Sequence, residues 1–129
     1  MSSSNEKAKI LLVDDDEFHL SIAEEMLKND YIVITAQSGK KAIELLSKGL
    51  IPNIILLDVL MPEMDGWETL ARIKAISCLH NASIAFLTSL KGGIAEERHA
   101  KELGADAFIS KHISKEELIK KVEALLKHT

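Results

Sequence analysis

Short runs of consecutive apolar residues alternate along the chain with longer segments in which apolar positions recur at helical spacing. The short runs cover residues 10–13, 31–34, 54–57 and 84–87, and a weaker fifth run covers residues 105–109. Their apolarity is continuous rather than alternating, which is typical of strands buried on both faces of a parallel sheet. The pattern therefore predicts five buried strands.

Each apolar run is followed by a segment that predicts a helix. The positions that mark these helices are Phe18, Ile22 and Met26; Ala42, Leu45 and Leu46; Leu70, Ile73 and Ile76; residues 94–103; and Leu118, Val122 and Leu125. Gly49 and Gly104 follow the second and fourth segments, as expected of helix C-termini. Ser114 and Glu117 form a capping box that begins the fifth helix.

Five successive strand–helix units predict an α/β fold: a five-stranded parallel sheet with right-handed crossovers and helices on both faces. The 129 residues suit one domain, which we place at residues 8–129 after a flexible polar tail at residues 1–7. In such sheets, ligands bind outside the carboxyl ends of the strands. Functional groups are therefore expected directly after the apolar runs.

Composition narrows the class of protein further. The net charge of −4 argues against electrostatic binding to nucleic acid or anionic lipid. The apolar runs are far shorter than the roughly 20 residues that a membrane-spanning helix needs. The one cysteine, Cys78, allows no disulfide within the chain and fits a reducing, cytoplasmic location.

Polar side chains follow four of the five predicted strands. Asp14 and Asp15 follow the first strand, Asp58 the third, Thr88 the fourth and Lys111 the fifth. Converging carboxylates repel one another unless a cation lies among them, and carboxylate oxygens favour Mg²⁺. A hydroxyl and an ammonium can hold phosphoryl oxygens, and a carboxylate can accept a phosphoryl group. We expect Asp58 to be that acceptor, with Asp14 and Asp15 holding the metal.

Each of these residues also has a plain structural explanation. The acidic run that ends at Asp16 could be a solvated turn that caps the first helix, and Asp16 itself suits that role. Thr88 could be an ordinary loop hydroxyl, and Lys111 an ordinary surface lysine. Asp58 is harder to explain in this way, because it ends a run of four apolar residues. The joint arrangement at four strand ends favours a functional site.

These residues resemble the receiver domain of two-component response regulators. Residues 10–16 resemble that family's first strand and acidic pocket, and residues 55–66 its phosphoacceptor segment. Residues 87–89 and 104–111 are similar to its later motifs. The resemblance covers about residues 8–127 and implies a flavodoxin-like (βα)5 fold.

The resemblance also implies a chemistry. Asp58 would take a phosphoryl group from the phosphohistidine of a histidine kinase or histidine phosphotransfer protein. The Mg²⁺ ligands that it implies are Asp15, Asp58 and the main-chain carbonyl of Leu60, with Asp14 acting through water. The domain would catalyse its own phosphorylation and a slow dephosphorylation, and would not be an enzyme in the usual sense. Slow dephosphorylation is expected because Leu60 and Leu90 stand two residues after Asp58 and Thr88, at positions that tune dephosphorylation in this family. Both are apolar here and cannot position an attacking water by hydrogen bonding.

Three further residues take roles from the resemblance. Thr88 is similar to the switch hydroxyl, Lys111 to the cation that binds the phosphoryl oxygens, and Phe108 to the aromatic residue that changes rotamer with the hydroxyl. His112 departs from the family, which usually has a proline there after a cis bond. Because a cis bond before another residue costs about 2.5–4 kcal/mol, we expect a trans bond and a reshaped loop.

Two alternative functions stay open. A haloacid-dehalogenase-like phosphatase also uses an aspartate nucleophile and Mg²⁺, and a degenerate receiver would act only as an interaction module. Because no DNA-binding segment follows the last predicted helix, we expect output through a separate effector protein or a role as a relay intermediate, unless the sequence is a receiver from a larger regulator or hybrid kinase. The protein is expected to act as a monomer or a phosphorylation-dependent dimer. Trp67 is expected to be a partly buried packing residue. The histidines expected at the surface or rim are His19, His80, His99 and His128.

Overall fold

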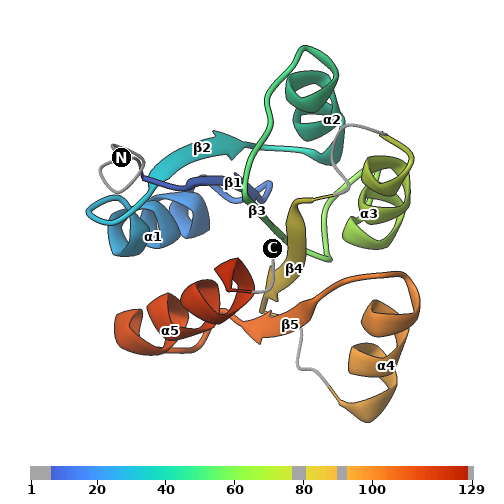
Figure 1. The fold of residues 1–129 in the computed structure, drawn as a ribbon. Coiled ribbons are helices and arrows are strands. Elements are labelled where there is room, and N and C mark those ends of the chain that lie inside the picture. Colours follow the sequence, from blue (N-terminus) through green and yellow to red (C-terminus); the bar gives the residue numbers. More distant parts are fainter. Residues whose placement is uncertain (1–6, 77–80, 90–92, 128–129) are drawn as a thin grey trace.

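The computed structural model describes residues 7–76, 81–89 and 93–127, and it contains the five predicted strand–helix units (Figure 1). The strands are β1 (Lys9–Val13), β2 (Ile32–Ala36), β3 (Ile54–Leu57), β4 (Ser83–Thr88) and β5 (Ala107–Ser110). The helices are α1 (Glu17–Leu27), α2 (Gly39–Ser47), α3 (Gly66–Lys74), α4 (Ile94–Glu102) and α5 (Lys115–Leu126). All strands pair in parallel in the order β2-β1-β3-β4-β5, which confirms the predicted α/β fold.

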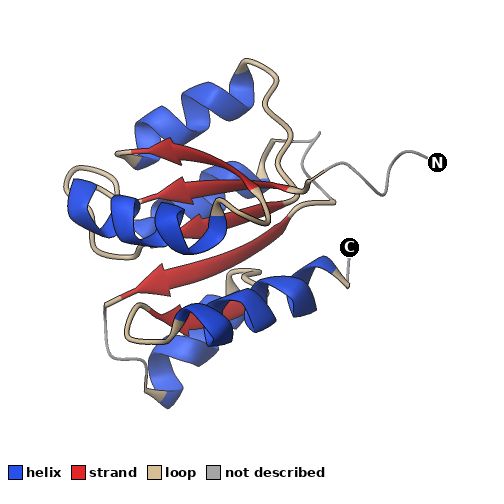
Figure 2. Cartoon of the chain, turned by 90° about the vertical axis from the view of Figure 1, so that its left-hand side faces the viewer, coloured by secondary structure: helices blue, strands red, loops and turns tan. Residues whose placement is uncertain are grey.

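The sheet lies between two layers of helices. Helices α1 and α5 cover one face, and α2, α3 and α4 cover the other (Figures 1 and 2). Successive side chains of a strand point to opposite faces, so Leu11 and Leu12 of β1 belong to two separate cores. Ile55 and Leu56 of β3 divide in the same way. This two-sided burial explains why the apolar runs are continuous.

The first helix is present, but the residues that indicated it are not its buried face. Phe18 and Ile22 are 68% and 40% exposed. The residues that α1 buries against the sheet are Leu20, Ala23 and Leu27. The helix has apolar residues on more than one side, so their spacing predicts the helix without predicting which side packs.

Four strands differ in their bounds from the prediction: β1 begins one residue earlier, β4 extends one residue further at each end, and β2 and β5 begin later. β2 begins one residue later than predicted and extends to Ala36, and Tyr31 before it is buried among residues of α1 and α5. β5 begins at Ala107 rather than Ala105. Here Asp106 donates its backbone N–H to the Ile84 carbonyl (2.7 Å) and accepts the Ile84 N–H on Oδ2 (2.9 Å). The side-chain carboxylate of Asp106 thus takes the place of a backbone carbonyl in the pairing with β4.

The predicted helix ends are confirmed. Gly49 and Gly104 follow α2 and α4 with positive φ angles of 113° and 98°, a region that glycine adopts without strain. Ser114 accepts the Glu117 N–H on its hydroxyl at 3.1 Å, which forms the capping box of α5. Within the described residues, no helix combines the length and the apolar character needed to cross a bilayer.

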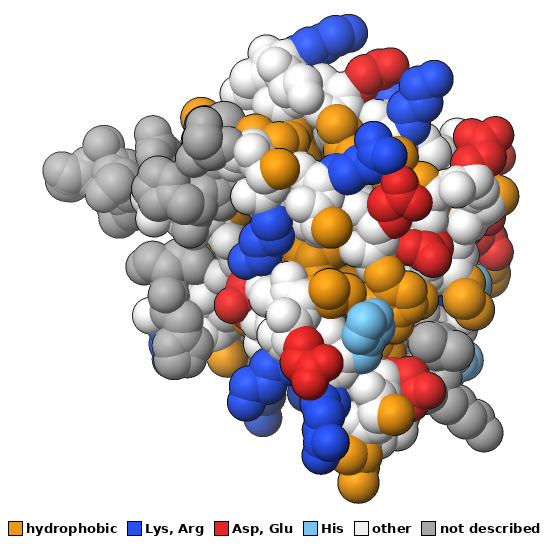
Figure 3. Space-filling model, turned by 90° about the vertical axis from the view of Figure 1, so that its right-hand side faces the viewer, with side chains coloured by type: hydrophobic (Ala, Val, Ile, Leu, Met, Phe, Trp, Pro, Cys, Tyr) orange, Lys and Arg blue, Asp and Glu red, His pale blue; other side chains and the backbone are white. Residues whose placement is uncertain are grey.

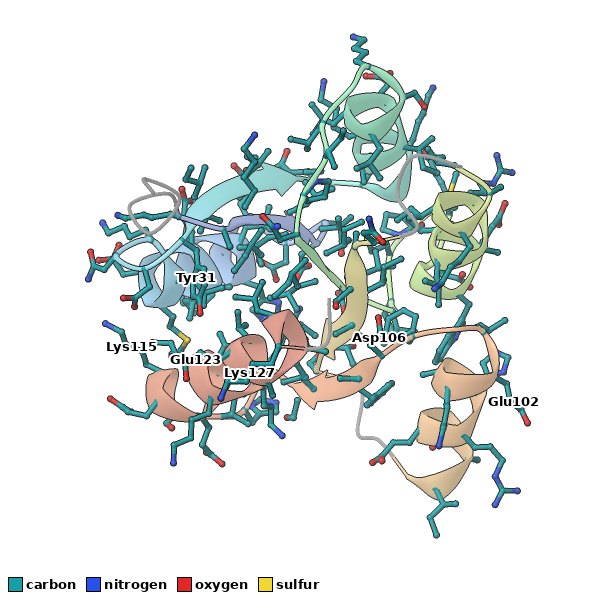
Figure 4. All side chains as sticks on the ribbon, viewed as in Figure 1. Tyr31, Glu102, Asp106, Lys115, Glu123 and Lys127 are labelled. Carbon is teal, nitrogen blue, oxygen red and sulfur yellow. The ribbon has the colours of Figure 1, made fainter. Side chains whose placement is uncertain are left out.

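Tyr31 lies beside α5, on the same side of the molecule as Glu123 (Figure 4). Its side chain is only 7% exposed. Burial raises the pKa of the Tyr31 phenol, and the negative charges of Glu123 and Asp30 raise it further. The phenol therefore stays neutral in the folded protein to a higher pH than in the unfolded chain.

Candidate functional site

The acidic residues of the motifs meet at the carboxyl edge of the sheet. The Asp14 N–H bonds to the Ala36 carbonyl at the end of β2 (3.1 Å), and the Asp58 N–H bonds to the Val13 carbonyl at the end of β1 (2.9 Å). These bonds continue the strand pairing by one residue and fix both backbones. Asp14 and Asp58 are 6% and 5% exposed, whereas Asp15 is exposed.

Three carboxylates form one cluster at this edge. Asp14, Asp15 and Asp58 each have an oxygen within 4.8 Å of the other two. Burial raises the pKa of Asp14, and repulsion from Asp58 adds to the effect. The hydrogen bonds from Lys111 and from the Asp16 N–H oppose it. An all-oxygen donor set that includes one exposed carboxylate suits Mg²⁺, which keeps several water ligands.

The two oxygens of Asp58 have different surroundings. Oδ1 accepts the Val59 N–H at 2.9 Å, and Oδ2 lies 3.4 Å from the Lys111 ammonium. One oxygen is therefore tied to the backbone, and the other faces a cation.

The segment after Asp58 packs closely against the acid's own backbone. Helix α3 begins at Gly66, whose N–H bonds to the Val59 carbonyl (2.8 Å). A Cβ at Gly66 would lie 2.2 Å from the Asp58 carbonyl oxygen, so only glycine allows this approach. Between them, Glu63 has a φ of 68° and Leu60 is 59% exposed. The loop thus leaves β3, exposes Leu60 and returns at Gly66 to pack against the backbone of Asp58.

Lys111 reaches the cluster from the loop after β5. Its side chain is 12% exposed and its ammonium contacts one oxygen each of Asp14 and Asp58. No cis peptide bond occurs among the described residues, so the Lys111–His112 bond is trans as expected. The trans bond does not displace Lys111, because its N–H still pairs with the Thr88 carbonyl at 2.9 Å.

His19 belongs to this site, although no motif indicated it. Its Nδ1 lies 2.8 Å from the Lys111 Nζ, and 3.8 and 3.6 Å from carboxylate oxygens of Asp14 and Asp16. The expectation that His19 lies at a rim is consistent with this, but its contact with Lys111 was missed. Asp16 caps α1 by accepting the Phe18 and His19 N–H groups, as predicted.

The hydroxyl and the aromatic residue of the later motifs lie on neighbouring strands. Thr88 is fully buried at the end of β4, opposite Ser110 of β5. Phe108 of β5 is opposite Phe86, and their ring centroids are 6.1 Å apart. Phe108 is thus two residues away from the position opposite Thr88.

A row of aromatic contacts joins these strands to two helices. The Trp67 ring is 4.8 Å from Phe86 and 4.5 Å from His99 of α4, centroid to centroid. Trp67 is partly buried, which confirms its expected packing role. Leu90, Cys78, His80 and His128 lie outside the described residues.

Comparisons with known proteins identify the family. Residues 10–123 match the response regulator receiver domain, and the chain therefore belongs to this family of two-component signalling proteins. The chain is 35% identical to the transcriptional regulatory protein CpxR of Escherichia coli strain K12, over 94% of the chain and 50% of that protein. It is 33% identical to protein PilG of Pseudomonas aeruginosa, over 96% of the chain and 91% of that protein.

Comparison with solved structures supports the same family. The chemotaxis protein CheY4 of Vibrio cholerae superposes with a TM-score of 0.87 at 28% identity, over 93% of this chain and 99% of that one. The chain spans about half the length of several of the curated relatives that it matches. Receiver domains are signalling domains that bind Mg²⁺ at an acidic pocket, and the cluster of Asp14, Asp15 and Asp58 could hold such an ion.

Proposed function

We propose that this receiver accepts a phosphoryl group on Asp58 from the phosphohistidine of a histidine kinase or phosphotransfer protein. One observation carries the proposal: the buried carboxylate of Asp58 lies close to two further carboxylates, Asp14 and Asp15, and to the nearly buried ammonium of Lys111. Burying like charges is unfavourable unless the site binds a cation or transfers an anionic group. Packing alone gives no reason for the arrangement.

The geometry assigns separate roles to the two oxygens of Asp58. Because Oδ1 is held by the Val59 N–H, Oδ2 is the oxygen available to attack phosphorus. Attack forms the acyl phosphate bond as the P–N bond to the donor imidazole breaks, and the imidazole takes up a proton as it leaves. Lys111 stands 3.4 Å from Oδ2, where it can bind an oxygen of the transferring group.

The metal ligands are proposed from the same cluster. Asp15 and Asp58 would hold Mg²⁺ with the main-chain carbonyl of Leu60, and Asp14 would act through water. Bound Mg²⁺ supplies positive charge that offsets the repulsion between the carboxylates and the phosphoryl oxygens. The chain's own contribution is to hold two carboxylates rigidly at strand ends and to leave Asp15 exposed for exchange with water.

The output step would use Thr88 and Phe108. A phosphoryl group on Asp58 attracts the Thr88 hydroxyl, and the space that this movement opens lets the partly buried Phe108 ring turn. Helix α4 packs on β5, so the conformational equilibrium of the surface formed by α4, β5 and α5 would shift. On the α3–α4 side, hydrophobic side chains lie among acidic and basic ones (Figure 3), and Ile94 of α4 is 80% exposed. Such a mixed surface suits a protein effector.

The donor protein is proposed to dock on α1. Phe18, Ile22 and Met26 line a pocket that continues to Lys111 and Ile113 beside the acidic site. An apolar surface that surrounds the mouth of the site can hold a partner helix while its phosphohistidine reaches Asp58. This role would explain why Phe18 and Ile22 of α1 are exposed. We place this exchange in the cytoplasm.

Phosphorylation of the purified protein tests the proposal. The protein is incubated with Mg²⁺ and acetyl phosphate, and its intact mass is measured. We expect one phosphoryl group on the wild type and on Asp16→Asn, which keeps the helix cap, but none on Asp58→Asn. Absence of an adduct together with absence of Mg²⁺ binding would support the degenerate module, and continuous donor hydrolysis that requires Asp14 would support the phosphatase.

A further inference from the structure

His19 contacts the phosphorylation machinery, yet the proposed function gives it no role. Its side chain projects from α1 toward Lys111, and Nδ1 lies 2.8 Å from Nζ. An ammonium can only donate hydrogen bonds, so Nδ1 accepts the bond and the ring carries its proton on Nε2. We infer that His19 is a positioning residue whose Nδ1 lone pair holds the Lys111 ammonium beside Asp58.

The three acceptors around Lys111 support this role. The ammonium has three N–H groups, and its contacts are Asp14 Oδ2, Asp58 Oδ2 and His19 Nδ1. Asp14 and Asp58 are also the carboxylates of the proposed metal site, so a cation would compete with Lys111 for their oxygens. His19 is the one of the three that is not a carboxylate of the proposed metal site. It can therefore hold the ammonium in place even when the two carboxylates bind a cation.

The other charged groups near the imidazole do not compete with this bond. Asp14 and Asp16 approach Nδ1 at 3.8 and 3.6 Å, and both distances exceed the 2.8 Å contact with Lys111. Asp16 accepts the Phe18 N–H at 2.9 Å on Oδ1 as the cap of α1, and its Oδ2 is the oxygen 3.6 Å from Nδ1. The shortest contact of Nδ1 therefore decides its role as an acceptor.

The loop after β5 shows why a side-chain restraint is useful here. His112 stands where the family usually has proline, its peptide bond is trans, and it is exposed. Its N–H bonds to the Ser110 hydroxyl, at 3.0 Å. A lysine side chain loses much rotamer freedom when it is ordered, and this loop lacks the ring that would stiffen the backbone. The bond to His19 supplies the missing restraint from another element.

The inference rests on the proposed function and is tested by the rate of phosphorylation. His19→Leu removes the acceptor, whereas His19→Asn places an amide oxygen close to the position of Nδ1. With Mg²⁺ and acetyl phosphate, we expect His19→Leu to slow phosphorylation of Asp58 about tenfold and His19→Asn to restore the rate to within about threefold. Ser21→Leu, at an exposed position of the same helix, is the matched control and should keep the wild-type rate.

A second comparison shows whether the effect passes through Lys111. In a Lys111→Gln background, His19→Leu should slow phosphorylation by less than about twofold, because the bond is already lost. A tenfold effect in both backgrounds would overturn the inference. So would equal rates for wild type and His19→Leu, or equal losses for His19→Leu and His19→Asn.

A measurement without phosphoryl transfer separates this inference from the proposed function. The ¹⁵N shifts of the His19 ring should report a proton on Nε2 and a lone pair on Nδ1, and the Nδ1 shift should change in Lys111→Gln. A proton on Nδ1 would refute the contact even if Asp58 is phosphorylated. If the wild type takes up no phosphoryl group while the shifts agree, the proposed function fails and the contact stands.

Discussion

Gly66→Ala tests whether the start of α3 holds Asp58 in place. The added Cβ would lie 2.2 Å from the Asp58 carbonyl oxygen and 2.8 Å from the Val59 Cα. Both are backbone atoms, so rotation of a side chain cannot relieve the overlap. To reach an ordinary contact of about 3.5 Å, the helix start and the Asp58 peptide must separate by roughly 1.3 Å.

This movement would lower both the stability of the protein and the rate of phosphorylation. Overpacking of this kind costs about 1–3 kcal/mol. With an unfolding entropy of about 2.1 cal/mol/K per residue, each kcal/mol lowers the Tm of a chain this size by roughly 4 °C. Displacement of a reacting group by about 1 Å can cost about 100-fold in rate. We therefore expect Gly66→Ala to lower Tm by roughly 4–12 °C and phosphorylation by about 100-fold.

Gly39→Ala is the matched control. Gly39 is the first residue of α2, as Gly66 is of α3, and its Cβ would also meet an oxygen at 2.2 Å. That oxygen belongs to the Thr69 side chain, which bonds to the Asp65 carbonyl (2.7 Å) and not to the acidic site. Losing this bond costs about 1–2 kcal/mol. The control should thus lose similar stability while its phosphorylation rate stays close to that of the wild type.

The assay follows thermal unfolding by circular dichroism and phosphoryl uptake from acetyl phosphate by intact mass. Rates are measured well below both unfolding midpoints, so that only folded protein reacts. If Gly66→Ala is phosphorylated at the wild-type rate, the close approach of α3 does not position Asp58. If Gly39→Ala loses as much activity as Gly66→Ala, general destabilisation explains both results, and the reasoning is refuted.

Three further predictions concern stability. Because burial and Glu123 raise the pKa of Tyr31, the native state keeps the phenol proton to a higher pH than the unfolded chain does, and the free energy of unfolding falls as pH rises above about 10. Tyr31→Phe should flatten this fall when the free energy of unfolding is measured by urea titration at a series of pH values. An unchanged dependence on pH would contradict the prediction. Phe86 is fully buried, so Phe86→Ala should cost about 3–5 kcal/mol, and a loss below about 1 kcal/mol in the same titrations would mean that the core closes around the gap. Ser114→Ala should lower the free energy of unfolding by about 1 kcal/mol, whereas Ser114→Asp should restore it by capping α5; failure of this rescue would exclude the cap as the cause.

The sequence alone determined the layers of the fold. Continuous apolar runs at residues 10–13 and 54–57 require burial on both sides, and a sheet with helices on both faces provides it. The parallel direction of the strands then brings their carboxyl ends to one edge, which is why Asp14 and Asp58 could be placed together. Local signals such as the Ser114 capping box needed no tertiary information, because both partners lie within one turn.

Tertiary structure decided the contacts between distant segments. Nothing in the spacing of α1 shows that Phe18 is exposed while Leu20 is buried, because the helix has apolar residues on both sides and the sheet selects one. The start of β5 depends on Asp106 pairing with Ile84 from another strand. Hydrophobic periodicity indicates that a helix or a strand is present, and it does not report which residue will lie beside a given position.

His19 illustrates the same limit at the functional site. Lys111 is 92 residues away in the chain, and only the packing of α1 beside the loop after β5 brings the imidazole to 2.8 Å from the ammonium. The family's motifs place the acid, the hydroxyl and the lysine because each lies at the end of its own strand or directly after it. A helix side chain that meets one of them is set by helix orientation, which depends on the whole core. The sequence therefore predicted the candidate reacting groups, and the tertiary structure decided which side chains lie against them.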